Sequence, residues 1–136
     1  MKKDCIGNDV RILSHQIHRW IENSPNKKKI DSVTGANAWI IGYISEQTKN
    51  NEDVFQKDLE KNFEITRSTA SKVVNLMVEK GMVERQSVPW DARLKKLVLT
   101  DKGREIDELM LEDFSVVEET LSKGFSEQEL EQFFDY

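Results

Sequence analysis

The spacing of hydrophobic residues predicts a helix near the start of the chain. Apolar residues recur there at intervals of four, three, four and three, which places them on one face of a helix over about 6–23. A seam this regular needs a partner helix to cover it. Its residues are Ile6, Val10, Leu13, Ile17 and Trp20.

A second apolar stripe follows Thr100, which is suited to cap the start of a long helix. Gly124 is expected to break this helix, and Ser126 with Glu129 forms a capping box for a short final helix. So much apolar surface on a short helix favours burial against a second subunit. The long helix carries Ile106, Leu109, Met110, Phe114, Val117 and Leu121, and the final helix carries Leu130, Phe133 and Phe134.

The region between 24 and 62 predicts a loop and two helices. The segment 24–33 is interpreted as a loop because it contains Pro25 and three consecutive lysines. These lysines either contact phosphate or form an ordinary solvated charge run. Thr34 is the predicted N-cap of a helix over 36–47, and a shorter helix is expected over 54–62. The expected buried residues are Trp39, Ile40, Tyr43 and Ile44 in the first helix and Val54, Phe55 and Leu59 in the second.

The stretch 65–104 predicts a helix, a β-hairpin and the start of another helix. Thr66 is a favourable N-cap, and Gly81 stands where a left-handed residue commonly ends a helix. The helix over 66–80 has an apolar face with Ala70, Val73, Met77 and Val78, and a polar face with Arg67, Ser68, Ser71, Lys72 and Asn75. The polar face carries no carboxylate, so it suits base edges and phosphates. A short helix, a tight turn and this helix form a helix-turn-helix pattern.

The hairpin is predicted from two short β-prone runs, 83–86 and 94–99. They surround a loop of several residues over 88–92, where a proline and an aspartate mark a turn. Arg93, Lys95 and Lys96 crowd the return strand. The two lysines are either phosphate contacts or edge-strand lysines that discourage aggregation.

Charge is distributed unevenly along the chain. The net charge is −5, which by itself argues against DNA binding. However, residues 66–104 hold nine Lys or Arg and four Asp or Glu, whereas residues 105–136 hold one and eleven. The positive surplus therefore coincides with the helix and the hairpin, and the acidic segment must face away from DNA or lie in an interface.

Length and composition place further bounds on the function. A chain of 136 residues with 33% charged residues is expected to form a single domain, and no apolar run reaches the length of a membrane span. We therefore expect a cytoplasmic protein. The single cysteine, Cys5, excludes an internal disulfide, and His15 and His18 have no third ligand nearby for a metal. No phosphate-binding loop or nucleophile motif favours an enzyme, and no cofactor is expected.

This order of elements resembles the MarR (multiple antibiotic resistance regulator) family of winged-helix transcription regulators over essentially the whole chain. The most specific segments are 65–71 (ITRSTAS), 79–85 (EKGMVER), 91–93 (DAR) and 99–104 (LTDKGR). The resemblance implies that Arg93 enters the minor groove while Asp91 helps to hold the wing. It also implies a homodimer in which the first, fifth and last helices of both subunits interlock, and which binds pseudo-palindromic operators.

The resulting interpretation is a mainly α fold with a small β-hairpin wing. Residues 6–33 and 105–136 would form the dimerisation helices, and 34–104 the winged helix-turn-helix lobe of one domain, 1–136. The expected function is that of a homodimeric repressor that recognises specific double-stranded DNA. The residues expected to contact DNA are Arg67, Ser68, Thr69, Ser71, Lys72, Asn75, Asp91, Arg93, Lys95 and Lys96. The alternative is a winged-helix protein-interaction module that does not bind DNA.

The resemblance further implies release from DNA by a small, often aromatic, ligand or by cysteine oxidation. Trp20, Trp39 and Tyr43 are the candidates to line a ligand cleft, although aromatic residues on apolar helix faces are also ordinary core residues. Cys5 fits the oxidation-sensing branch poorly, because that branch carries its cysteine further into the first helix. The sequence therefore leaves the effector and the regulated genes open.

Overall fold

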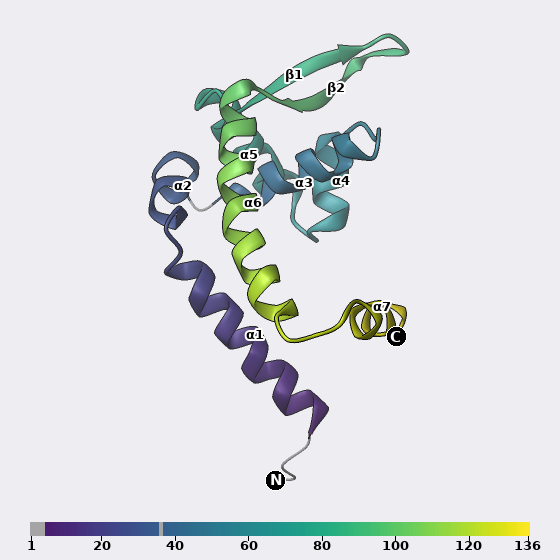
Figure 1. Cartoon of the computed structure of the whole chain (residues 1–136). Coiled ribbons are helices and arrows are strands. Elements are labelled where there is room, and N and C mark those ends of the chain that lie inside the picture. The colour runs from purple at the N-terminus through teal and green to yellow at the C-terminus, as the bar shows by residue number, and fades with distance from the viewer. Residues whose placement is uncertain (1–4, 36) are drawn as a thin grey trace. The chain divides into compact units, whose positions relative to one another are not determined.

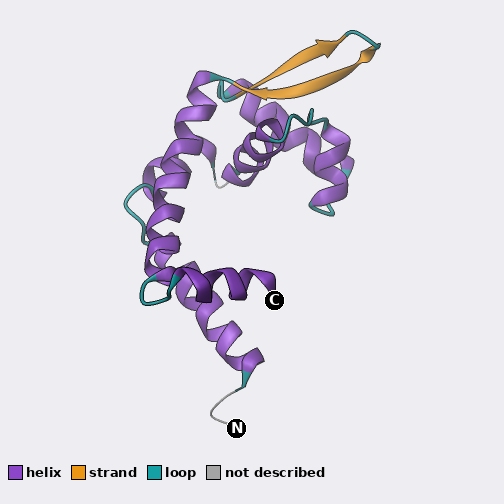
Figure 2. Cartoon of the chain, turned by 45° about the vertical axis from the view of Figure 1, so that its right-hand side comes forward, coloured by secondary structure: helices purple, strands orange, loops and turns teal. Residues whose placement is uncertain are grey.

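A computed structural model describes residues 5–35 and 37–136 of the chain. These residues form mainly α-helices with one two-stranded antiparallel hairpin, which confirms the predicted fold class (Figures 1 and 2). They divide into two compact units: Lys28–Met110, and the described residues up to Lys27 together with Leu111–Tyr136. None of the helices in the described residues combines the length and apolar character that a membrane span requires.

The unit Lys28–Met110 contains the helix-turn-helix and the hairpin. Its elements are most of α2 (Lys27–Thr34), then α3 (Ala38–Lys49), α4 (Gln56–Asn62), α5 (Arg67–Glu79), β1 (Val83–Val88), β2 (Asp91–Leu99) and the first part of α6 (Asp101–Ser122). Apolar residues from all of them form one core, in which Ile40, Ile41, Ile44, Leu59, Val74, Met77 and Met82 are fully buried. Burial of a large aliphatic side chain contributes about 1.5–3 kcal/mol, so this core can hold the unit together.

The other unit contains α1 (Ile6–Glu22), the later part of α6 and α7 (Glu127–Asp135). The segment after α1 is tied to α6 by polar contacts: the Ser24 hydroxyl donates to a buried Asp113 carboxylate oxygen at 2.7 Å, and the Asn26 amide donates to the other at 3.2 Å. The described residues of α1 and α7 include no buried side chain. The predicted apolar seam of α1 is therefore largely exposed in a single chain.

The predicted loop over 24–33 was wrong from residue 27 onward, because α2 occupies Lys27–Thr34. Ile30 and Thr34 lie one helical turn apart and are both buried, and lysine is a good helix former. Thr34 consequently does not cap the next helix. Its hydroxyl donates to the Ile30 carbonyl at 2.8 Å, and Asn37 stands at the N-cap of α3. Ala36, the predicted start of that helix, lies outside the described residues.

Other helix boundaries agree closely with the sequence pattern. Thr66 caps α5 by accepting from the Thr69 N–H, and Gly81 has the left-handed φ of 75° that ends it. Gly124 is left-handed at φ 92°, and Ser126 and Glu129 form the expected capping box. The predictions of buried residues were less accurate. Trp39, Tyr43, Phe55 and Val78, which were expected to be buried, are half-buried. Two residues that were not predicted, Ile41 of α3 and Val74 of α5, are buried instead.

Candidate nucleic-acid interface

The predicted polar face of α5 is exposed. Arg67, Ser68, Lys72 and Asn75 are exposed, while Ser71 is half-buried. Thr69 is exposed too, but its hydroxyl accepts from the Thr66 hydroxyl at 3.0 Å and so belongs to the N-cap. The opposite face buries Ala70, Val73, Val74 and Met77. The helix therefore offers hydroxyl, amide and cationic groups outward from a rigid base.

The C-terminal end of α5 is anchored by residues at the start of α6. The Thr100 hydroxyl donates to the Gly81 carbonyl at 2.6 Å, and the Lys102 ammonium donates to the Lys80 carbonyl at 3.0 Å. These donors satisfy carbonyls that a helix end leaves without partners. Gly103 lies so close that an added Cβ would stand 2.2 Å from the Met82 carbonyl oxygen. The segment 99–104 thus positions α5 rather than offering groups to a ligand.

The hairpin differs from its prediction in the length of its loop. Val88 pairs with Asp91, so only Pro89 and Trp90 connect the strands, in place of a loop over 88–92. Pro89 has no N–H, and the turn requires none there. The next pair along the hairpin is Ser87 with Lys95. The three residues of β2 between Asp91 and Lys95 therefore have no partner on β1. This irregularity carries Arg93 out of the regular ladder.

Asp91 holds the conformation of this irregular segment. Its carboxylate accepts from the Arg93 backbone N–H at 2.9 Å and from the Arg93 Nε at 3.3 Å. The backbone N–H of Arg93 lowers the pKa of Asp91, and the Arg93 side chain lowers it further. The Arg93 side chain is 91% exposed and the Asp91 side chain only 27%. The Arg93 side chain is therefore largely exposed while its guanidinium stays paired with the Asp91 carboxylate.

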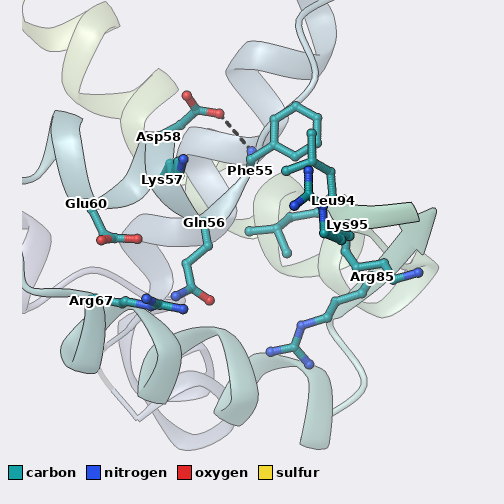
Figure 3. A pocket seen from close by; sticks show the side chains of 11 residues that line it. Phe55, Gln56, Lys57, Asp58, Glu60, Arg67, Arg85, Leu94 and Lys95 are labelled. Carbon is teal, nitrogen blue, oxygen red and sulfur yellow. Dashed lines mark hydrogen bonds between the residues drawn. The ribbon is translucent and has the colours of Figure 1, made fainter. Parts of the chain in front are cut away.

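An open pocket of about 690 Å³ lies between α4, α5 and the hairpin. Figure 3 shows Arg67 of α5 and Arg85 of β1 at this pocket together with Gln56 and Lys57 of α4. Arg93 and Lys95 line it as well, so five of its eleven lining residues are cationic and two are acidic. A pocket with this surplus of positive charge suits a phosphate group.

Arg85 and Gln56 were not among the predicted DNA contacts. Arg85 lies on β1, and its guanidinium donates to the Asn75 side-chain carbonyl oxygen at 2.5 Å. This bond engages the acceptor of Asn75, so its amide N–H groups remain to face a ligand. No periodic signal in β1 distinguishes Arg85, because the contact that places it joins β1 to Asn75 of α5.

The two wing lysines differ in their contacts. The Lys95 ammonium donates to the Ser87 hydroxyl at 2.7 Å and stays exposed at the pocket. The Lys96 ammonium lies 3.9 Å from an Asp53 carboxylate oxygen, and its side chain is only 33% exposed. Because Lys96 already has an anionic partner, Lys95 is the better placed of the two to neutralise a phosphate.

The candidate ligand residues fall into two places. In the unit Lys28–Met110, Phe63 at the end of α4 packs against Trp39 and Tyr43, with ring centroids 4.5 Å and 5.2 Å away. The Asn62 amide donates to the Tyr43 hydroxyl at 2.9 Å, and burial is the main cause that raises the pKa of Tyr43. Trp20 belongs to the other unit, where it lines a shallow pocket with Gln16, Arg19, Asn23 and Pro25.

The remaining titratable candidates form no site in the part of the chain that the structure describes. His18 lies 3.8 Å from the Glu22 carboxylate one turn along α1, and Cys5 precedes that helix as a half-buried free thiol. No group of three or more metal-ligating side chains occurs among the described residues.

The chain is similar to solved regulators over nearly its whole length. It is 29% identical to the transcription regulator MarR from Oenococcus oeni PSU-1, with a TM-score of 0.63 and coverage of 96% of this chain and 94% of that one. It is 25% identical to MepR of S. aureus in a DNA complex, with a TM-score of 0.67 and coverage of 92% and 89%.

A third similar structure is the heme sensor PefR from Streptococcus agalactiae in complex with heme, at 20% identity, a TM-score of 0.59 and coverage of 99% and 89%. Comparison with curated proteins gave no significant match. Residues 32–94, which span α3 to the wing, match the model of the MarR family. The chain is therefore similar to the MarR family in sequence over residues 32–94 and to these solved regulators in fold over nearly its whole length.

Proposed function

We propose that the protein is a homodimeric transcription regulator that binds specific double-stranded DNA and represses the genes beside its operator. The exposed polar face of α5 carries the proposal, because it presents Arg67, Ser68 and Lys72 without a carboxylate among them. Two copies of this helix would enter successive major grooves, about 10 base pairs apart. The MepR relative in a DNA complex, at 25% identity, supports this assignment.

The wing would complete each contact from the flanking minor groove. Arg93 extends from the irregular segment of β2, and a narrowed minor groove attracts arginine. Asp91 would act indirectly by holding Arg93. Ser71, Asn75 and Lys95 complete the proposed contact surface. Thr69 contributes less because its hydroxyl belongs to the N-cap of α5, and Lys96 contributes less because it is only 33% exposed and faces the Asp53 carboxylate.

Dimerisation is proposed from the apolar surfaces outside the core. The exposed fractions of Ile6, Val10, Phe133 and Phe134 are between 60% and 83%. Exposed apolar area on this scale is typical of an interface in a larger assembly. The acidic surplus of residues 105–136 would then lie with the dimer body and not on the DNA-contacting surface.

Release by a small ligand is the regulatory part of the proposal. Trp39 and Tyr43 contact Phe63, which caps the C-terminal end of α4 just before the turn into α5. A flat aromatic compound bound beside these rings would shift DNA affinity only if it favoured one arrangement of α4 and α5 over another. Titration of aromatic compounds into the protein–DNA complex, with Trp39→Leu as the variant, tests this part.

The DNA-binding part is tested by gel shift with genomic fragments from around the protein's own coding region. The protein should retain a subset of fragments, and Arg93→Ala should weaken their binding by about ten- to hundredfold. Arg11→Ala provides a matched control, because Arg11 is an exposed arginine on α1 whose side chain bonds Asn8 in the same helix. Equal affinities of both variants at near-physiological salt would contradict the role of the wing.

A further inference from the structure

Trp90 lies at the tip of the hairpin, and its large apolar side chain is mostly exposed. It is one of the two residues that connect β1 to β2, and it is 65% exposed, compared with 36% for Trp20. Within the part of the chain that the structure describes, its side chain makes no hydrogen bond and no ring contact. A solvated indole forgoes the burial energy that a large aromatic side chain normally supplies.

The charges around Trp90 indicate the chemistry of a partner. The neighbouring Asp91 carboxylate accepts from the Arg93 backbone N–H and pairs with its side chain, which is 91% exposed, so the tip segment carries an exposed indole and an exposed guanidinium three residues apart. Arg93 also lines the pocket that Arg67 of α5 and Arg85 of β1 line. Arg93, three residues after Trp90, therefore belongs to the cationic pocket between α4, α5 and the hairpin. A polyanion with apolar faces fits such a surface better than an uncharged partner.

We propose that Trp90 is a DNA-contacting residue whose indole packs against the deoxyribose rings that line the minor groove beside Arg93. The proposal rests on the proposed function, since it needs the wing to lie on DNA. Proteins that bind the minor groove commonly place apolar side chains there, and the indole has a flat apolar face for the sugars. Arg93 would supply the electrostatic part of the wing contact, and Trp90 the part that excludes water.

These different roles of Arg93 and Trp90 predict that their loss changes the salt dependence of DNA affinity differently. Neutralising a phosphate releases counterions, so losing a cation reduces the dependence of affinity on salt. The indole is uncharged, so its loss weakens binding by the same factor at every salt concentration. Trp90→Ala should reduce affinity at least about fivefold with an unchanged salt slope. Trp90→Phe, which keeps a flat ring, should recover part of that loss.

The direct test uses the full chain labelled with 5-fluorotryptophan and observed by ¹⁹F NMR. The chain has three tryptophans, and the signal that disappears in Trp90→Phe is assigned to Trp90. The probe is a duplex of about 30 base pairs from a retained genomic fragment, long enough for two half-sites and their flanks. In free protein the Trp90 signal should differ between H₂O and D₂O; on DNA it should shift and lose that solvent dependence.

The outcomes separate this proposal from the function on which it rests. Suppose that gel shifts show all of the protein bound to DNA while the Trp90 signal keeps its position and solvent dependence. The proposed Trp90 contact is then wrong, and DNA binding stands. If Trp90→Ala binds as tightly as the parent at every salt concentration, the contact is likewise overturned. If no duplex is retained at all, both proposals fail together. A shifted, solvent-protected signal and an unchanged slope in Trp90→Ala support the contact.

Discussion

In the unit Lys28–Met110, apolar residues from the helices and the hairpin converge on one core, whereas in the other unit the apolar residues of α1 and α7 face solvent. The first arrangement is complete within one chain. The second leaves Ile6 83% and Phe134 74% exposed. The difference supports the proposed separation of two tasks: one unit would hold the DNA-contacting surface, and the other would offer the apolar area with which a second copy can assemble.

The largest effect is expected in the unit that contains α1 and α7, whose apolar residues are exposed in a single chain. Val10→Asp places a carboxylate in the seam of α1, where the proposed dimer would bury it at a cost of several kcal/mol. Sedimentation equilibrium should then show the mass of one chain in place of two. His15→Asp lies on the opposite face of the same helix and should leave the mass of the parent unchanged. If Val10→Asp keeps the parent's mass, the seam is not the interface.

The next prediction tests the complete unit. Gly103→Ala forces a methyl group against the Met82 carbonyl, and such overpacking should lower the free energy of unfolding by about 1–3 kcal/mol. Gly42→Ala is the matched control, because its Cβ would meet nothing within 4 Å; it should raise that free energy by up to about 1 kcal/mol. Urea denaturation at one protein concentration measures both. Equal shifts in the same direction would contradict the close approach of α6 to the end of α5.

A smaller effect is expected where α5 meets the phosphates. Lys72→Ala should reduce the slope of log affinity against log salt by about one unit, since it would remove one phosphate contact. Lys96→Ala should change the slope less, because Lys96 already faces Asp53. Neither substitution should change the number of chains in the assembly. If Lys72→Ala has the same slope as the parent protein, Lys72 does not contact a phosphate.

The smallest effect concerns the wing and pH. The Arg93 backbone N–H lowers the pKa of Asp91, so the bond contributes above the ordinary aspartate pKa and is lost as pH falls through the lower folded value. Near neutral pH the wing should therefore be insensitive to pH. Carboxyl NMR titration should give Asp91 a midpoint below the ordinary aspartate range. A midpoint within that range would show that the Asp91–Arg93 contact does not persist in solution.

Local signals in the sequence located the elements that depend on local chemistry. Thr66, Gly81 and Ser126 act within one turn of their own helix, so caps and breaks could be predicted. The helix α2 could not, because the burial of Ile30 and Thr34 depends on elements distant in the sequence. The lysine run and Pro25 pointed instead to a loop.

The candidate interface divides in the same way. The face of α5 followed from helical periodicity, which is a local property. The contacts of Arg85 with Asn75 and of Lys96 with Asp53 join separate elements, and they distinguish residues that the sequence treated alike. The two-residue tip of the hairpin also escaped prediction, because the irregular register on β2 absorbs the three residues from Ala92 to Leu94.

In the proposed dimer, the apolar seams of the other unit hold two copies of the exposed α5 surface together. Sedimentation of the protein with a retained duplex, combined with footprinting of the same fragment, tests it most directly. We expect two chains per duplex and two protected half-sites with centres about 10 base pairs apart. One chain per duplex, or protection that is the same on every sequence, would contradict it.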